Sequence, residues 1–202
     1  FCVGLKHMNP CGAAIGKDVV EAWTKAYEAD TTSIFGGIVA TNQEINLEVA
    51  QLMKPIFLEI IMAPHFTREA FDFLSTKKNI RLIEVTMDAV PEAPEMLYKS
   101  VSGGLLAQDE DLAMAQLTDA MTVTKKHATA EEITDLQFGL TIVKHVKSNA
   151  IVVVKNGQTL GVGAGQMNRI GSAEIALKQA HGNGVKEGLV LASEAFFPFD
   201  DC

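Results

Sequence analysis

The chain has 202 residues, of which 48% are hydrophobic and 21% are charged, and its formal net charge at pH 7 is −8. This length and composition are typical of a globular protein that buries one large core or two small ones. The acidic balance, without a Lys/Arg-rich run, argues against nucleic-acid binding, and no apolar run reaches the roughly eighteen residues of a membrane span.

The three cysteines, Cys2, Cys11 and Cys202, are widely spaced. They predict neither a disulfide framework nor a Cys-x-x-Cys metal site, and a reducing, cytoplasmic setting fits them best. No basic-then-apolar leader opens the chain. The first residues read as the middle of a strand and the last ones end without a closing element, so we expect a piece of a longer protein.

Hydrophobic periodicity predicts alternating strands and helices in the first part of the chain. Asp18 is the expected N-cap of the first helix, and a turn is expected over 9–12. The Gly36-Gly37 pair interrupts a strand, which indicates a bulge or a close backbone approach. The expected strands are 2–5, 34–40, 56–62 and 80–85, the expected helices are 18–29, 47–53 and 68–75, and a loop is expected over 88–95.

One charge interrupts an otherwise apolar run. Residues 56–62 are typical of a strand covered on both faces, and Glu59 is the only charged residue among them. Because a carboxylate almost never enters a core unpaired, we expect Glu59 to hold a ligand or an internal cation.

The second part of the chain begins with a predicted helix over 131–146, which contains the pair Lys144-His145. Asn156-Gly157 then lies between two apolar runs, which is the strongest short signal for a hairpin with a type I′ turn. A helix over 172–181, a strand over 189–192 and an aromatic turn over 196–199 follow. The alternation of strands and helices predicts a layered α/β fold.

Polar residues and glycines gather at both ends of this predicted hairpin. The amides of Asn149 and Gln166 suit a substrate amide or a heterocycle edge, and Arg169 could pair with a carboxylate or a phosphate. The glycines within 161–165 would let a ligand approach the backbone. A flexible turn after an edge strand, and a solvent-facing arginine at a helix start, remain as alternatives.

Lys6-His7 stands at the end of the first predicted strand. The neighbouring ammonium disfavours imidazolium, so His7 is available as a base near neutral pH, while Lys6 can stabilise developing negative charge. Taken alone, the pair favours a simpler interpretation, a surface lysine beside a histidine that bonds a backbone carbonyl.

Known cofactor motifs fail on inspection. The glycines of 161–165 have neither the spacing of the dinucleotide fingerprint nor the Gly-Lys-Ser/Thr of a P-loop. Pro10-Cys11 is followed by Ala14 where a zinc deaminase has its second cysteine, and His7 does not begin a His-x-Glu pattern, so zinc-water chemistry is excluded on ligands. A weak echo between 5–14 and 143–150 would imply two related halves, divided within 119–128.

Several segments together carry a resemblance to a known family. In chain order they are Lys6-His7, Asn9-Pro10-Cys11-Gly12, Ser33-Ile34-Phe35-Gly36-Gly37, Glu59-Ile60-Ile61-Met62-Ala63-Pro64, Lys144-His145-Val146-Lys147-Ser148-Asn149-Ala150, Gly163-Ala164-Gly165-Gln166-Met167-Asn168-Arg169 and Ala195-Phe196-Phe197-Pro198-Phe199. The chain resembles the bifunctional AICAR transformylase/IMP cyclohydrolase family of purine biosynthesis, over the transformylase domain only.

The resemblance implies formyl transfer from 10-formyltetrahydrofolate to the 5-amino group of AICAR. It also implies a cytidine-deaminase-like α/β fold with two related subdomains, which we place at 1–120 and 121–202, without catalytic zinc. It further implies a homodimer with interfacial sites. By motif position, Lys6, His7 and Asn149 match its catalytic trio.

Further matches concern the two substrates and a potassium ion. The resemblance places Phe35, Gly36 and Arg169 near the nucleotide, and Glu59, Ile170 and Phe196 near the folate. Some relatives bind potassium around a serine and an acidic residue that correspond to Ser148 and Glu194. Glu194 stands in place of the usual Asp, and Asp200 in place of the usual Arg, so the chain departs from the family pattern here.

The chain lacks family segments that contact AICAR upstream and downstream, so we expect little activity from this piece alone. The alternative function is a non-catalytic module of the same fold that binds a purine or a pterin. A deaminase-like metalloenzyme is a third reading, which the cysteine positions disfavour.

Overall fold

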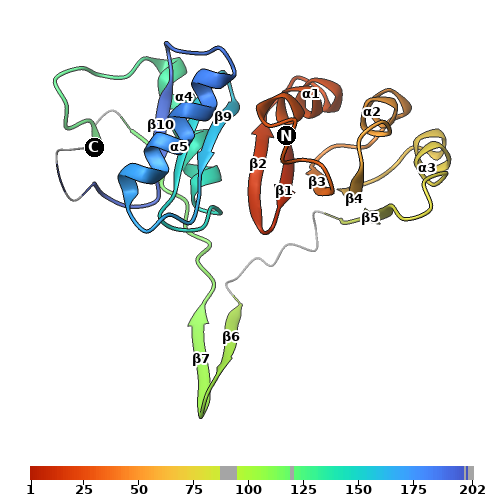
Figure 1. The fold of residues 1–202 in the computed structure, drawn as a ribbon, viewed down its shortest axis with the longest axis horizontal. Helices are drawn as coiled ribbons and strands as arrows, with labels where there is room; N and C mark the ends of the chain where they lie inside the picture. The colour runs from red at the N-terminus through yellow and green to blue at the C-terminus, as the bar shows by residue number, and fades with distance from the viewer. Residues whose placement is uncertain (87–94, 119–120, 198, 200–202) are drawn as a thin grey trace.

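The computed structural model describes residues 1–86, 95–118, 121–197 and 199. An eight-stranded mixed sheet runs through it with the strand order β10-β8-β9-β2-β1-β3-β4-β5. Helices pack on both faces of the sheet, and a separate two-stranded hairpin projects from it (Figure 1). The α/β class expected from the alternation of elements is confirmed.

The elements of the first part of the chain all belong to this sheet or pack on it. They are β1 (Cys2–Lys6), β2 (Asn9–Ala14), α1 (Val19–Ala29), β3 (Gly37–Thr41), α2 (Leu47–Met53), β4 (Leu58–Ala63), α3 (Arg68–Leu74) and β5 (Arg81–Glu84). The projecting hairpin consists of β6 (Met96–Val101) and β7 (Gly104–Asp109). The second part contains α4 (Ala130–Val143), β8 (Ile151–Lys155), β9 (Gln158–Gly163), α5 (Arg169–Gly182) and β10 (Val190–Ser193).

The helices begin where a side chain satisfies free backbone N–H groups. Asp18 accepts a hydrogen bond of 2.8 Å from the N–H of Glu21, which confirms it as the N-cap of α1. Thr129 and Glu132 form a capping box at the start of α4. The sequence located the start of α1 correctly and the start of α4 to within one residue, because caps and apolar stripes are local signals.

Two local expectations are wrong, and one hairpin was missed. Residues 9–12 belong to strand β2 and not to a turn. Helix α4 ends at Val143 with Lys144 as its C-cap, so Lys144-His145 lies outside the helix. The hairpin of β6 and β7 was not expected, because strands with no buried face show no clean hydrophobic alternation. The loop expected over 88–95 falls almost wholly outside the described residues.

The same arrangement of elements occurs twice in the sheet. Hairpin β1-β2, helix α1 and strand β3 correspond to hairpin β8-β9, helix α5 and strand β10. In both halves the first hairpin strand lies between the second hairpin strand and the third strand, to which it is antiparallel. Strands β2 and β9 meet in the middle, where Ala14 pairs with Gln158.

The two hairpins also agree in register. Gly4 pairs with Gly12 as Val153 pairs with Gly161, and directly after that pair the register shifts by one residue in both hairpins. Such a shift is a β-bulge. Each hairpin closes with a two-residue turn, and both residues of each turn have positive φ.

These turns are His7-Met8, with φ of 50° and 69°, and Asn156-Gly157, with φ of 53° and 65°. The turn expected at Asn156-Gly157 is confirmed. The echo in the sequence set Lys6 against Lys144, whereas the hairpin registers set Lys6 against Lys155.

Glycines bring a helix close to a strand in each half. A side chain at Gly12 would overlap the carbonyl oxygen of Ala26 in α1, and one at Gly161 would overlap that of Ala176 in α5. Gly163 faces α5 in the same way, at Ser172. The expectation that these glycines leave room for a ligand is therefore wrong for 161 and 163, where the helix backbone fills the space.

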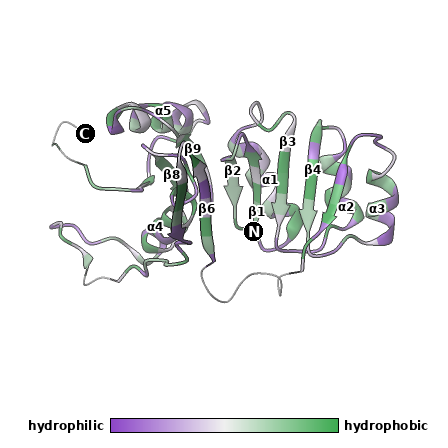
Figure 2. Cartoon of the chain, turned by 90° about the horizontal axis from the view of Figure 1, so that it is seen from below, coloured by the Kyte–Doolittle hydropathy of each residue, from purple (hydrophilic) through white to green (hydrophobic). Residues whose placement is uncertain are grey.

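Apolar residues fill the space between sheet and helices. In the first half, α1, α2 and α3 cover one face of the sheet, with Trp23, Val39 and Ile61 in the core, and the strands of this half carry mostly hydrophobic residues (Figure 2). In the second half, α5 and α4 cover opposite faces of β8, so that Val153 packs toward α5 and Val154 toward α4. Among the described residues, no helix is both long and apolar enough to cross a membrane.

Gly161→Ala is expected to lower the free energy of unfolding by about 1–3 kcal/mol, because the new methyl group would push α5 away from β9. Urea unfolding followed by circular dichroism measures this. Gly182→Ala is the matched control, since no atom lies within 4 Å of the added carbon and alanine favours a helix. Equal effects of the two substitutions would contradict the packing argument.

Candidate functional site

A cavity of about 370 Å³ opens at the end of β1, and several residues predicted for the site line it. Its lining consists of Leu5, Lys6, His7, Gly36, Ile38, Glu59, Ile60 and Arg81. The volume is within the range of small-molecule sites. The chain therefore folds so that residues far apart in the sequence share one hollow on the sheet.

Lys6 is held at the edge of this cavity by the loop that precedes β3. Its Nζ donates a hydrogen bond of 2.5 Å to the carbonyl oxygen of Phe35. Gly36 has φ of 67°, and a side chain there would begin 3.0 Å from Lys6 Nζ. Glycine is thus required both by the backbone conformation and by the space that the ammonium occupies. The ring of Phe35, 65% exposed, packs on Phe57 with 5.2 Å between centroids.

His7 lies at the tip of the first hairpin. Positive φ at two successive residues without a glycine is uncommon, and such strain clusters at functional sites. Asn9 braces the tip, because its Oδ1 accepts a hydrogen bond of 2.9 Å from the N–H of Lys147. This contact joins the hairpin tip to the segment that contains Asn149.

Glu59 does not sit in a core. Strand β4 is only partly buried along one face, and the Glu59 side chain is 41% exposed. Its Oε2 accepts a hydrogen bond of 2.7 Å from Nη1 of Arg81 on the neighbouring strand β5. The expectation of a strand covered on both faces is wrong, and the cation that pairs with Glu59 is a half-exposed arginine.

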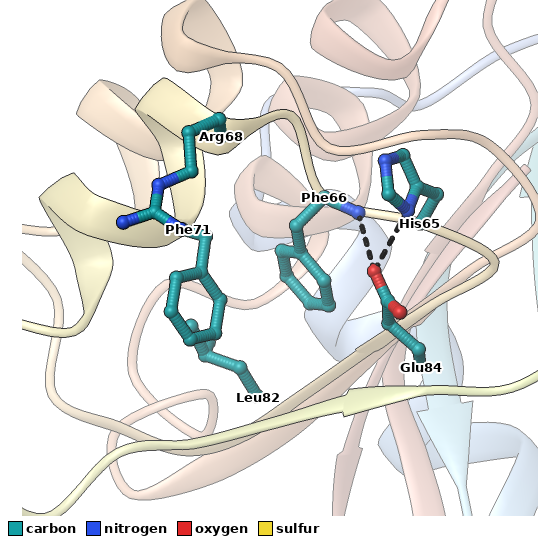
Figure 3. A pocket seen from close by; sticks show the side chains of 6 residues that line it. All are labelled: His65, Phe66, Arg68, Phe71, Leu82 and Glu84. Atoms are coloured by element: carbon teal, nitrogen blue, oxygen red, sulfur yellow. Dashed lines mark hydrogen bonds and ion pairs between the residues drawn. The ribbon is translucent and has the colours of Figure 1, made fainter.

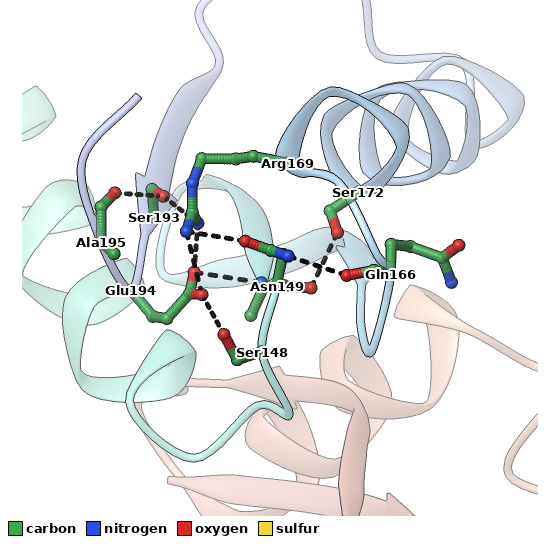
Figure 4. Close-up of polar contacts among 9 residues, drawn as sticks. Ser148, Asn149, Gln166, Arg169, Ser172, Ser193, Glu194 and Ala195 are labelled. Atoms are coloured by element: carbon green, nitrogen blue, oxygen red, sulfur yellow. Dashed lines mark hydrogen bonds and ion pairs between the residues drawn. The ribbon is translucent and has the colours of Figure 1, made fainter. Parts of the chain in front are cut away.

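A second cluster of polar residues lies at the start of α5 and the end of β10 (Figure 4). The carboxylate of Glu194 accepts hydrogen bonds from Ser148 Oγ at 2.6 Å, from the N–H of Ala150 at 3.0 Å and from both terminal nitrogens of Arg169. Arg169 also donates to Ser193 Oγ at 2.9 Å. The cluster thereby ties three separate segments of the second half together.

Arg169 belongs to the interior of this cluster. Its side chain is 10% exposed, its guanidinium lies 6.0 Å from the ring centroid of Phe197, and its Nε is buried with no hydrogen-bond partner among the described residues. The carboxylate that Arg169 was expected to bind is thus Glu194 of the chain itself. The alternative of a solvent-facing arginine is wrong.

Asn149 is engaged on both sides of its amide. Its Oδ1 accepts from Arg169 Nη2 at 2.8 Å, and its Nδ2 donates to the carbonyl oxygen of Gln166 at 2.8 Å. The side chain of Gln166 points away from this cluster and donates to the carbonyl oxygen of Ala164 (Figure 4). Asn149 and Gln166 are therefore joined by a hydrogen bond from the side chain of Asn149 to the backbone of Gln166. Their two side-chain amides do not form one common binding surface.

The environment of Glu194 strongly lowers the pKa of its carboxyl group. Burial, the largest single effect, raises the pKa of the carboxyl group, but hydrogen bonds from Arg169, Ser148 and the Ala150 N–H, with the charge of Arg169, outweigh it and lower the pKa to about 2. Glu194 is therefore ionised throughout the physiological range and compensates the charge of Arg169.

The expected sites are thus brought together only in part. Lys6, His7, Gly36 and Glu59 line one cavity, whereas Ser148, Asn149, Arg169 and Glu194 form the polar cluster. The two groups are connected by the bond between Asn9 and Lys147. Ile170 is half-buried and Phe196 is 79% exposed, and neither lines the cavity.

Ser148 and Glu194 do meet, as the expectation of a potassium site requires. However, the guanidinium of Arg169 already faces the Glu194 carboxylate and supplies its counter-charge. Within the described residues, no group of three or more His, Cys, Asp and Glu side chains could share a metal ion.

A further cavity, of about 440 Å³, lies at the outer edge of the sheet, where β5 meets the loop before α3 (Figure 3). Glu84 accepts a hydrogen bond of 3.2 Å there from the N–H of Phe66, and its carboxylate lies 2.8 Å from His65 Nδ1. The side chains of His65 and Glu84 are both more than half exposed, so their contact contributes little to stability. It fastens the loop to the edge strand.

Sequence reasoning missed Arg81 and Asn9. Arg81 reaches Glu59 only because β4 and β5 are parallel neighbours, with Ile60 opposite Arg81. Asn9 reaches Lys147 across 138 residues of sequence. Neither contact has a local signal, since both depend on strand order and on the docking of the two halves.

The fold and the site together define a mixed α/β protein with a basic, small-molecule-sized cavity beside a buried arginine–carboxylate cluster. The chain matches the model of the AICARFT/IMPCHase bienzyme family over residues 1–179. It therefore belongs to this family.

Comparison with individual proteins agrees with this assignment. The chain is similar to proteins named bifunctional purine biosynthesis protein PurH, with 52% identity for Pediococcus pentosaceus, 54% for Anoxybacillus flavithermus and 56% for Listeria monocytogenes. These matches cover 99%, 98% and 98% of the chain, but only 39%, 38% and 38% of the relatives. The chain thus spans about two fifths of the length of these curated relatives.

Glu194→Gln is expected to destabilise the protein in a pH-dependent way. The folded pKa of about 2 lies below the ordinary 4.5, so the unfolded chain binds more protons between these values and stability falls as the pH drops through this window. Each pH unit of the difference is worth about 1.4 kcal/mol, so the ionised carboxylate contributes about 3 kcal/mol at neutral pH.

Urea midpoints measured from pH 7 down to pH 2 test this expectation. The variant should be less stable than the wild type at pH 7, and the difference should shrink toward pH 2. Glu174→Gln, at an exposed position on the same helix α5, is the control and should follow the wild type. A constant difference at every pH would contradict the role assigned to the carboxylate.

Proposed function

We propose that the chain carries part of the site that transfers a formyl group from 10-formyltetrahydrofolate to the 5-amino group of AICAR. The observation that carries the proposal is the meeting of Lys6 and His7 at one cavity, in a chain that belongs to the AICARFT/IMPCHase bienzyme family. The parent protein is proposed to carry IMP cyclohydrolase activity on a domain outside this chain.

The reaction requires a weak aromatic amine to attack a formyl carbon. A bond forms between the amine nitrogen of AICAR and that carbon, and the bond from the carbon to N10 of the folate breaks. His7 takes the proton released by the amine, and N10 gains a proton as it leaves. Lys6 stabilises the negative oxygen of the tetrahedral intermediate.

Lys6 is already placed for this role. Its ammonium donates to the carbonyl oxygen of Phe35 at 2.5 Å, and its remaining N–H groups are available to a second acceptor. Because the bond to Phe35 fixes the ammonium at the edge of the cavity, little conformational entropy would be lost when it binds the negative oxygen.

Asn149 is proposed to orient the reacting groups from the neighbouring cluster. Its amide is anchored between Arg169 and the backbone of Gln166, which gives it one fixed orientation. With Phe35 and Gly36, Arg169 is proposed to lie on the nucleotide side, where its pairing with Glu194 makes it a positioning residue and not a free cation.

The folate side is proposed to involve Glu59 within the cavity and, outside it, Ile170 and Phe196. Gln166 is proposed as a further substrate-binding residue. The exposure of Phe196, 79%, leaves its ring free to stack on a ligand. A potassium ion near Glu194 would have to share the carboxylate with Arg169. No step of the proposed formyl transfer requires this ion.

The repeated arrangement of strands and helices supports a cytidine-deaminase-like fold without catalytic zinc and with two related subdomains, proposed as 1–120 and 121–202. Each half has a hairpin, a helix and a third strand in the same spatial order. The free thiols of Cys2 and Cys11 fit the cytoplasmic setting that we propose.

A homodimer is proposed as the working assembly. Every residue of β6 and β7 is exposed, and the hairpin carries apolar side chains such as Tyr98, Leu105 and Leu106, exposed by 65%, 57% and 58%. A two-stranded hairpin is marginally stable alone, and Figure 1 shows it projecting away from the sheet. We propose that a second copy of the chain covers this arm.

His7→Ala in the complete protein is expected to lower the rate of formyl transfer by about 100-fold or more, because the amine loses its proton acceptor. Cyclohydrolase activity should be unchanged. His181→Ala, at an exposed position near the end of α5, is the control and should leave both activities intact. Formyl transfer at the wild-type rate in His7→Ala would remove His7 from the mechanism.

The alternative is a non-catalytic module that binds a purine or a pterin. Calorimetry with an AICAR analogue and with a folate, followed by an activity assay of the complete protein, distinguishes the two. Binding without turnover in the complete protein would favour the module. The 202-residue chain alone is expected to turn over slowly at best, and a full-length rate from it would contradict that expectation.

Replacing Leu105 and Leu106 by serine in the complete protein is expected to weaken the dimer, because apolar contacts of the arm are lost. Sedimentation velocity over a range of concentrations measures the dissociation constant. Leu52→Ser is the control, since Leu52 is 45% exposed but lies on α2. An unchanged dissociation constant in the arm variant would exclude the arm from the interface.

A further inference from the structure

The internal repeat extends to the side chains beside each hairpin turn. Lys6 Nζ donates to the carbonyl oxygen of Phe35, directly before Gly36, which has φ of 67°. In the second half, Lys155 Nζ donates at 2.8 Å to the carbonyl oxygen of Glu187, directly before Gly188, which has φ of 65°. The lysine that precedes each turn is therefore held in the same way in both halves.

The turn in the second half binds a carboxylate. Asp135 of α4 accepts a hydrogen bond of 2.7 Å from the N–H of Asn156 through Oδ2, and one of 2.7 Å from the N–H of Gly157 through Oδ1. The side chain of Asp135 is almost fully buried. Because both turn residues have positive φ, their N–H groups point to the same side and match the two oxygens of one carboxylate.

The turn in the first half has the same backbone conformation but no such partner. His7 and Met8 have φ of 50° and 69°, against 53° and 65° in the second half. Both residues are exposed, Met8 by 92%. No hydrogen bond to either N–H group comes from the described part of the chain.

A cavity occupies the place that α4 fills in the second half. Leu5 corresponds in register to Val154, which packs against α4, whereas Leu5 lines the cavity beside His7. Lys6, His7 and Arg81 make the lining basic, and the one carboxylate among the lining residues, Glu59, is paired with Arg81. An anionic group entering there would meet favourable charge.

We propose that the N–H groups of His7 and Met8 form a binding site for the carboxylate group of a small-molecule ligand that enters the cavity. In this site the carboxylate of the ligand would accept the same two hydrogen bonds that Asp135 accepts in the second half. It uses backbone donors, so it does not depend on the chemistry of the His7 imidazole. It also does not depend on formyl transfer.

Acetate is the probe, added stepwise to the isotope-labelled 202-residue chain while backbone amide resonances are recorded by NMR. The amides of His7 and Met8 should shift and reach saturation. Those of Asn156 and Gly157 should not respond, because Asp135 already occupies them. Absence of a saturable shift at His7 and Met8, or a larger response to inorganic phosphate than to acetate, would overturn the proposal.

Two variants separate the backbone from the side chain. Replacing His7 by Asn and Met8 by Gly reproduces the turn of the second half, and the acetate response should persist although the imidazole is gone. Replacing the two residues by a four-residue Gly-Ser-Gly-Ser loop should abolish it, since the N–H groups lose their common direction. Loss of the response in the Asn-Gly variant would assign the binding to the imidazole and overturn the proposal.

Discussion

The two-residue turn that closes each sheet hairpin is the constraint on which the rest of the structure depends. Both residues of each turn must adopt positive φ, which fixes the register of the hairpin and leaves one bulge at the same place in each. The register then places Lys6 beside the loop that precedes β3, and Lys155 beside the loop that precedes β10. Of these two turns, only His7-Met8 adopts positive φ without a glycine, and it lies where the cavity opens.

The two halves use this common framework differently. In the second half, α4 covers the hairpin and Asp135 satisfies the turn, while Arg169 and Glu194 neutralise each other at the end of β10. The buried carboxylate of Asp135 and the Arg169–Glu194 pair thus have their partners within the protein. In the first half the same face of the sheet is hollow and basic. A related framework thus has its hairpin turn bound by a carboxylate of the chain itself in one half, and leaves the corresponding turn beside an open cavity in the other.

Local signals in the sequence located most elements correctly. Asp18 predicted the start of α1, and Asn156-Gly157 predicted a turn, because caps and turns depend on a few neighbouring residues. The turn at His7-Met8 was missed, since neither residue favours positive φ and only the pairing of β1 with β2 imposes it. Glu59 was assigned to a core on hydrophobicity alone, yet its strand has one open face.

By itself, the sequence determined the α/β class, the places of most helices and strands, and the resemblance to a family, because periodicity, caps and motifs are written locally along the chain. Only the tertiary structure decided which candidates share a site. It placed His7 and Glu59 on one cavity, closed Arg169 onto Glu194, and filled the space beside Gly161 with α5. These outcomes follow from strand register and helix docking, which join residues that have no relation in sequence.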